Sequence, residues 1–229
     1  MRTVIVTGGG TGIGLATSTI LLNNGYNVIA AGLDREDELP TGLSFEELDV
    51  SSSSAVTDLI ENTSSLYGLV TCAGIQRHDR EWTTEDFAAV IDINLMSVFR
   101  ICNLALPKLQ ETGGSIVNIA SMWSFFGTPG SPAYGASKGG IVSLTRSLAV
   151  AGGKKGVRAN AVAPGWIDTR MASRAKNDPV RGPKILERIP LNRWAKPSEI
   201  GAVINFLLSG SASYINGAVI PVDGGYSIS

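Results

Sequence analysis

The segment that most constrains the fold of this chain is a glycine-rich turn near its N-terminus. Thr3-Val-Ile-Val6 is a short, continuously apolar run typical of a buried strand, and Leu15–Leu22 has the spacing of an amphipathic helix. Between them lies Thr7-Gly-Gly-Gly-Thr-Gly-Ile-Gly14. Glycines let the backbone turn sharply and let a pyrophosphate approach the free N–H groups at the helix start. We therefore predict a strand, turn and helix that bind a dinucleotide, the alternative being a plain structural turn.

Strands and helices are predicted to alternate along the chain, as in a parallel sheet. Further strands are expected at Asn27–Ala31, Phe45–Leu48, Gly68–Thr71, Ser115–Ala120, Val157–Ala163 and Ala218–Val222. Helices are expected at Ala55–Ser64, Thr84–Leu106, Tyr134–Ala151 and Ser198–Leu208, the last opened by Lys196-Pro-Ser-Glu199. We predict an α/β protein with one Rossmann-type, doubly wound parallel sheet of about seven strands.

The connection between the second and third predicted strands departs from this alternation. The stretch Arg35-Glu-Asp-Glu-Leu-Pro-Thr-Gly42 contains Pro and Gly and has no helical periodicity. We expect the crossover helix at this place to be shortened or missing.

Length and composition agree with one domain spanning residues 1–229. The 229 residues are 44% hydrophobic, and 19 basic against 20 acidic side chains give a net charge of −1. This balance favours small molecules, or further copies of the chain, as partners over nucleic acid or a membrane surface. No apolar run is expected to approach the ~20 residues of a membrane helix, and we expect a cytoplasmic protein. Cys72, Cys102 and the single His78 favour neither a disulfide nor a metal site.

An acid/base pair is predicted in Ala133-Tyr-Gly-Ala-Ser-Lys-Gly-Gly140. On a helix, Tyr134 and Lys138 share one face. Bringing a tyrosine pKa from about 10 to near 7 requires roughly 4 kcal/mol, which one cation at about 4 Å supplies at an effective dielectric near 20. Tyr134 would then exchange a proton with an alcohol or carbonyl while Ser121 holds the reacting oxygen. The alternative is that such a pair lies on the protein surface and has no catalytic role.

Together, these motifs resemble the short-chain dehydrogenase/reductase superfamily. They are Thr7-Gly8-x-x-x-Gly12-x-Gly14, Asn94, Ser121, Tyr134, Lys138, Pro164-Gly165 and the terminal Val222-Asp-Gly-Gly225. The resemblance implies an NAD(P)-dependent oxidoreductase with Asn94, Ser121, Tyr134 and Lys138 as its catalytic residues. It implies that Asn94 links the lysine to bulk water through a bound water. A polar residue that only packs a helix on the sheet is the other interpretation of Asn94.

The resemblance also implies the cofactor-binding residues. These are Gly8, Thr11, Gly12, Ile13, Gly14, Asp34, Asp49, Val50, Ala73, Gly74, Tyr134, Lys138, Pro164, Gly165, Ile167 and Thr169. NAD is expected over NADP, because Asp34 can accept hydrogen bonds from a ribose 2′-hydroxyl and repel a 2′-phosphate. Arg35 opposes this preference. The family's Asn-Asn-Ala-Gly is replaced by Thr71-Cys-Ala-Gly74.

A finer resemblance, to gluconate 5-dehydrogenases and their 2-dehydro-3-deoxygluconate relatives, concerns the substrate. It rests on Ala73-Gly-Ile-Gln-Arg-His78, Asn118-Ile-Ala-Ser-Met122 and Glu187-Arg-Ile-Pro-Leu-Asn-Arg-Trp194. Substrate contacts are expected from Gln76, Trp123, Phe126 and Trp166, and from a basic lid over residues 170–193 that could draw an anion. A sugar acid or polyol is the leading substrate. A 3-oxoacyl thioester reductase, a cyclic alcohol dehydrogenase and a nucleotide-sensing module without chemistry remain alternatives.

The resemblance implies a homotetramer as well. Gly139 and Gly140 lie beside Ile141, Leu144 and Leu148, and these small and apolar residues could form a close contact with a second copy. They could instead pack only against the sheet.

Overall fold

Across residues 2–229, which the computed structural model describes, seven strands form one sheet in the order β3-β2-β1-β4-β5-β6-β7. All neighbouring strands run parallel. The strands are β1 (Thr3–Thr7), β2 (Asn27–Gly32), β3 (Ser44–Glu47), β4 (Gly68–Thr71), β5 (Ser115–Ile119), β6 (Arg158–Pro164) and β7 (Val219–Val222). The predicted doubly wound sheet is confirmed. Its order reverses between β1 and β4, where such folds leave a crevice at the carboxyl ends.

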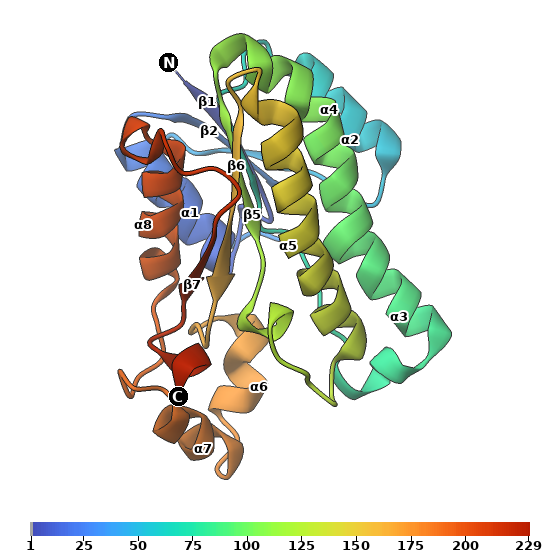
Figure 1. Ribbon diagram of the computed structural model, residues 1–229, viewed down its shortest axis with the longest axis vertical. Coiled ribbons are helices and arrows are strands. Elements are labelled where there is room, and N and C mark those ends of the chain that lie inside the picture. Colours follow the sequence, from blue (N-terminus) through green and yellow to red (C-terminus); the bar gives the residue numbers. More distant parts are fainter. Residues whose placement is uncertain (1) are drawn as a thin grey trace.

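Helices cover both faces of the sheet (Figure 1). On one face lie α1 (Gly12–Asn23) and α8 (Pro197–Leu208), and on the other lie α2 (Ser53–Asn62), α4 (Ser97–Thr112) and α5 (Pro132–Gly153). Each face has its own apolar core, with Val4 and Leu21 on the first side and Ile5 and Leu69 on the second. This division follows from the alternation of side chains along a strand.

Proline and glutamate define the starts of two long helices. Pro132 and Pro197 stand at the first helical positions of α5 and α8, where a missing N–H costs nothing. Glu199 accepts a hydrogen bond from the Lys196 backbone N–H at 2.8 Å, which closes the start of α8. Both helices begin within two residues of their predicted positions.

The connection from β2 to β3 contains no helix in the described chain, as predicted. The Glu36 N–H donates to the Gly10 carbonyl at 3.0 Å, and the Arg35 guanidinium lies 5.7 Å from the Phe45 ring centroid. These contacts hold the loop against the glycine-rich turn, so the loop forms part of the carboxyl edge of the sheet.

One continuous helical segment contains a π-helical stretch. It runs through α3 (Thr84–Ile91), the π segment η2 (Asp92–Met96) and α4, six residues beyond the predicted end, until Gly113 adopts a φ of 62°. By length and composition alone, the helical segment Thr84–Thr112 could cross a membrane, and we did not expect any segment to pass that test. That observation is weak, since core helices pass the same test and α4 places Val98 and Cys102 in the core.

Short elements gather beyond the carboxyl ends of the strands (Figure 1). They are the 3₁₀ helices η1 (His78–Trp82), η3 (Met122–Ser124) and η4 (Arg170–Ala172), followed by α6 (Ser173–Lys176) and α7 (Arg181–Arg188). Two further 3₁₀ turns, η5 (Gly210–Ala212) and η6 (Tyr226–Ile228), flank β7.

The surface expected to contact a second copy is partly internal. Ile141 and Leu148 are buried in the core between α5 and the sheet. A Cβ on Gly140 would lie 2.7 Å from Leu95 Cδ2, so this glycine permits close packing within the chain. Ile141 and Leu148 therefore pack against the chain's own core, and a contact of this surface with a second copy stays a prediction.

Candidate active site

A cavity of about 750 Å³ lies at the carboxyl ends of β1, β2 and β4. The predicted cofactor residues that line it are Gly8, Thr11, Gly12, Ile13, Gly14, Asp34, Asp49, Val50, Ala73, Gly74 and Thr169. Among the other predicted cofactor residues, Tyr134, Pro164, Gly165 and Ile167 line a neighbouring cavity instead, and Lys138 lines neither.

The glycine-rich turn fits a dinucleotide. A Cβ on Gly14 would lie 2.0 Å from the Gly8 carbonyl oxygen, so only glycine lets the turn close onto the first turn of α1. Gly8 has a φ of +63°, and a Cβ there would meet the Ala73 nitrogen at 2.8 Å. The start of α1 therefore remains uncovered, and its free N–H groups can bind a pyrophosphate.

Two acidic side chains line the same cavity near the end of β2. Asp34 was predicted and Glu36 was not. Across the cavity, Arg170 from η4 lies 3.4 Å from Glu36, Nη2 to Oε1. The loop that replaces the crossover helix thus brings negative charge to the place expected for the adenosine ribose, opposite one cation.

The replacement of the family's two asparagines has a structural consequence in β4. Thr71 donates a hydrogen bond of 2.8 Å to Asn118 on β5, and Cys72 lines the cofactor cavity. Burial raises the pKa of the Cys72 thiol to about 12, so it stays protonated. Cys72 and Cys102 are both free thiols.

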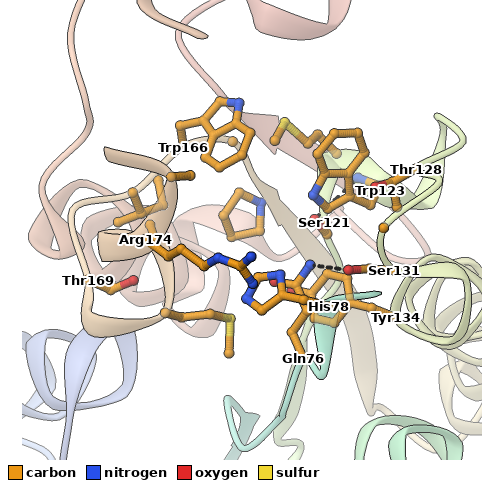
Figure 2. A pocket seen from close by; sticks show the side chains of 18 of the residues that line it. Gln76, His78, Ser121, Trp123, Thr128, Ser131, Tyr134, Trp166, Thr169 and Arg174 are labelled. Atoms are coloured by element: carbon orange, nitrogen blue, oxygen red, sulfur yellow. Dashed lines mark hydrogen bonds between the residues drawn. The ribbon is translucent and has the colours of Figure 1, made fainter. Parts of the chain in front are cut away.

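Ser121 and Tyr134 line a second cavity of about 430 Å³ (Figure 2). Ser121 follows β5, and Tyr134 lies in the first turn of α5, so the sheet edge and a helix start bring the two hydroxyls together. Ile13 and Thr169 line both cavities, which therefore adjoin. A molecule in the second cavity would lie between this hydroxyl pair and the dinucleotide cavity.

Lys138 and Asn94 lie behind the hydroxyl pair. Lys138, 4% exposed, donates from Nζ to the Ile119 carbonyl at 2.7 Å. Asn94, in the π segment, accepts from the Ile75 N–H at 2.8 Å and donates to the Ile75 carbonyl at 2.8 Å and to Ser137 Oγ at 3.2 Å. A Cβ on Gly74 would approach both groups, at 3.2 Å from Asn94 Oδ1 and 3.8 Å from Lys138 Nζ. Single π turns are frequent at functional sites.

The expected electrostatics of the Tyr134/Lys138 pair are wrong for this structure. Burial raises the pKa of Tyr134 to about 12, the interaction with Ser121 lowers it, and the charge of Glu81 raises it. Lys138 Nζ is 5.6 Å from the Tyr134 ring centroid and is itself buried, which lowers its own pKa to about 8. The desolvation of both groups outweighs the attraction between the ammonium and a phenolate.

The predicted substrate residues only partly line the second cavity. Gln76, Trp123 and Trp166 line it, whereas Phe126 does not. Phe126 packs against an apolar cluster and lies 5.5 Å from the Arg188 guanidinium. Trp166 makes edge contacts with Trp123 at 6.1 Å between ring centroids, so the wall behind the hydroxyl pair is aromatic.

Polar and basic residues also line the cavity. The predicted Gln76 donates a hydrogen bond of 2.7 Å to Ser131, which was not predicted, and Arg174 of the predicted basic lid extends from α6 into the cavity (Figure 2). His78 and Arg181 also line the cavity. Burial, and then the charges of Arg174 and Arg181, lower the pKa of His78. The basic character of residues 170–193 was visible in the sequence, but which of its cations enter the cavity was not.

Comparison with known proteins gives the class of this chain. The family model described as enoyl-(acyl carrier protein) reductase matches residues 8–227. The chain belongs to the short-chain dehydrogenase/reductase superfamily, as an NAD(P)-dependent oxidoreductase acting on CH–OH groups.

Individual relatives differ in their substrates. The chain is 35% identical to the 3-oxoacyl-[acyl-carrier-protein] reductase FabG of Thermotoga maritima, covering 99% of this chain and 98% of the relative. It is also 35% identical to the 2-dehydro-3-deoxy-D-gluconate 5-dehydrogenase of Bacillus subtilis, covering 98% and 94%. A protein of Agrobacterium tumefaciens, provisionally named 2-deoxy-D-gluconate 3-dehydrogenase and solved with bound NADP, superposes with a TM-score of 0.91 at 36% identity, covering 98% and 96%.

Proposed function

We propose that this protein interconverts a secondary alcohol and a ketone on a small hydroxylated acid, with NAD as the preferred cofactor. The observation that carries the proposal is the position of Ser121 and Tyr134 in a cavity that adjoins the glycine-lined cavity. A nucleotide-sensing module would not need this hydroxyl pair beside its ligand.

In this mechanism the chain's own residues hold the substrate and move its proton. A bound nicotinamide supplies or accepts the hydride. The Ser121 hydroxyl donates a hydrogen bond to the reacting oxygen, and the Tyr134 phenol gives its proton to a ketone or takes one from an alcohol. Lys138 stabilises the phenolate, and Asn94 fixes the Ile75 backbone beside it. Since burial raises the pKa of Tyr134 to about 12, the phenol is protonated at neutral pH and ready for ketone reduction before ligands bind.

A sugar acid or polyol acid is the proposed substrate. Arg174 and Arg181 line the cavity and can attract a carboxylate, and the neutral imidazole of His78 beside them can donate or accept a hydrogen bond. Gln76 and Ser131 offer hydrogen-bonding groups to substrate hydroxyls. We propose that residues 170–193, which carry the two arginines at the cavity mouth, act as the substrate lid. The Bacillus subtilis relative supports a sugar-acid substrate by its name.

Reduction of a 3-oxoacyl thioester is the second candidate function. The aromatic wall formed by Trp123 and Trp166 suits an apolar or cyclic substrate better than an open sugar chain. The Thermotoga maritima relative carries that activity in its name. The same wall keeps a cyclic alcohol among the candidates.

NAD preference rests on Asp34 and Glu36, because both acids line the cavity near the end of β2 and would repel a 2′-phosphate. Arg170 opposes the preference from across the cavity, and the Agrobacterium tumefaciens relative was solved with NADP. We further propose a cytoplasmic homotetramer, on the resemblance to the superfamily and on the exposed apolar side chains of Phe99 on α4 and Val150 on α5.

A substrate panel tests the function and the cofactor together. Sugar acids, polyols, cyclic alcohols and 3-oxoacyl thioesters are incubated with each cofactor, and the absorbance of the reduced nicotinamide is followed. We expect turnover of a sugar acid and at least about a tenfold higher kcat/KM with NAD(H). Turnover of thioesters or cyclic ketones alone would refute the sugar-acid proposal, and a tenfold advantage of NADP(H) would refute the cofactor preference.

A further inference from the structure

Glu81 is a carboxylate enclosed in the protein close to the hydroxyl pair, and the mechanism above does not use it. It lies in η1 and is 0% exposed. Acidic side chains are rarely buried completely, because removing a charge from water is costly unless partners compensate. Within residues 2–229, no basic side chain forms an ion pair with it. Its compensation therefore comes from other groups.

The two carboxylate oxygens bind two backbone N–H groups that are far apart in the sequence. Oε1 accepts from the Arg77 N–H at 2.8 Å, and Oε2 accepts from the Tyr134 N–H at 2.8 Å. The second N–H lies in the first turn of α5, where backbone donors lack helical partners and the helix dipole favours an anion. Glu81 thus ties the segment after Gln76 to the residue that carries the phenol.

This tie connects two segments that line the substrate cavity. Gln76 and His78 line the wall formed by one segment, and Tyr134, which pairs with Ser121, comes from the start of α5 (Figure 2). Arg77, whose N–H binds Glu81, stands between the two wall residues in the sequence. Small displacements between a reacting oxygen and its proton donor reduce rates strongly. A fixed distance between the wall and the phenol would therefore serve the reaction.

The charge of Glu81 also reaches the phenol, whose pKa it raises. Other charged groups on the elements packed against the start of α5 are arranged differently. Lys138 of α5 donates to the Ile119 carbonyl, and His78 of η1 lines the cavity. The acids form ion pairs: Asp86 of α3 with Arg77 and Arg80, Asp92 of η2 with Arg100 at 3.9 Å between Oδ1 and Nη2, and Asp79 of η1 with Arg174 at 3.7 Å between Oδ2 and Nη2. No titratable group lies in η3. Glu85 of α3 also forms no ion pair within the described residues, but it is exposed. Glu81 is thus the buried acid without a cationic partner on these elements.

We propose that Glu81 is a positioning residue for the proton transfer: its buried carboxylate holds the Tyr134 backbone against the substrate-side wall. The effect of its charge on the Tyr134 pKa supports this role. The proposal rests on the proposed function in that Tyr134 is taken as the proton-transfer group.

The test compares Glu81→Gln with Glu85→Gln, which removes an exposed carboxylate from the adjoining first turn of α3. The probe is the best substrate of the panel, and kcat and kcat/KM for alcohol oxidation are measured against pH. In Glu81→Gln, kcat should fall at least about fivefold, because the amide can replace only one of two acceptors. The rising limb of kcat/KM should move to lower pH by at least about half a unit, because a negative charge near the phenol is lost.

Glu85→Gln should change neither quantity. A Glu81→Gln enzyme whose rising limb stays at the wild-type pH, or whose kcat is unchanged, overturns the proposal, since a carboxylate that only caps a helix would lower the melting temperature alone. If Glu81→Gln does not fold, Glu81→Asp keeps the charge on a shorter arm. The kcat of Glu81→Asp should then be at least about fivefold lower than that of the wild type, while the rising limb of kcat/KM stays at the wild-type pH. An unchanged kcat overturns the proposal.

Failure of the proposed function gives a different result. If the wild-type protein turns over no member of the panel, tyrosinate absorbance is titrated directly, with the Tyr134→Phe protein subtracted to isolate one phenol. Glu81→Gln should lower the pH at which Tyr134 ionises, and an unmoved titration overturns the proposal without reference to any substrate.

Discussion

Lys138 carries its ammonium group in the interior of the molecule, where water cannot solvate it. Burial lowers its pKa from 10.5 to about 8 in the folded protein. Between these two values the unfolded chain binds more protons than the folded one, so the free energy of unfolding gains a component that rises with pH. Below about pH 8 the folded state bears the full cost of the buried charge.

Lys138→Met should remove this component. Urea unfolding of both proteins is measured from pH 7.5 to 10.5, and the stability of the wild type relative to the variant should increase with pH across the window. The difference between the two proteins isolates Lys138 from the other groups that titrate there. A difference that stays constant with pH would show that the ammonium is not held in a low-dielectric site.

At the same scale, the residues that the sequence could predict are those whose spacing has a local cause. Tyr134 and Lys138 share a helix face by their four-residue separation, and the glycines of the turn stand beside a strand and a helix start. Glu81 could not be predicted, because its partner Tyr134 is 53 residues away and only the fold brings them together. We also did not predict that the pKa of Tyr134 is raised, because the burial that raises it depends on how the whole core packs.

At the scale of elements, the loop between β2 and β3 was predictable and the π segment was not. Proline, glycine and the lack of periodicity exclude a helix at 35–42, whereas Asp92–Met96 has ordinary helical composition. A π turn depends on how α3 and α4 pack on the sheet. The periodicity of apolar residues in the sequence does not reveal that packing.

The proposed lid elements η4, α6 and α7 give a second prediction. Replacing Arg174 and Arg181 together by glutamine should raise the KM for a sugar acid about five- to tenfold and leave kcat within about twofold, because exposed cations contribute modest binding energy. Lys184→Gln, an exposed change on α7 away from the cavity, is the control. An unchanged KM in the double variant, or an equal rise with the control, would show that the lid cations do not bind the substrate.

At the scale of the whole molecule, large apolar side chains remain on the surface. Phe99 on α4 is 49% exposed and Val150 on α5 is 82% exposed, and Tyr214 and Ile228 near β7 are fully or almost fully exposed. α4 and α5 are neighbouring helices, and Phe99 and Val150 are exposed on them, whereas Ile141 and Leu148 are buried. Such surfaces mark contacts between proteins.

Light scattering at micromolar concentration should therefore give the mass of a tetramer. The pair Phe99→Glu and Val150→Glu should reduce that mass, since burying two charges in an interface is unfavourable. Val180→Glu, an exposed apolar position between α6 and α7, should leave it unchanged. A wild-type monomer would contradict the proposed assembly.

The central claim is that Tyr134 transfers the proton in an alcohol/ketone interconversion, and Tyr134→Phe tests it most directly. Turnover is measured for wild type, Tyr134→Phe and the control Tyr214→Phe, which alters a fully exposed tyrosine, and cofactor binding is measured by fluorescence. The account predicts a loss of at least ~10²-fold in kcat for Tyr134→Phe alone, with cofactor affinity nearly unchanged. A Tyr134→Phe enzyme that keeps most of its activity would contradict it.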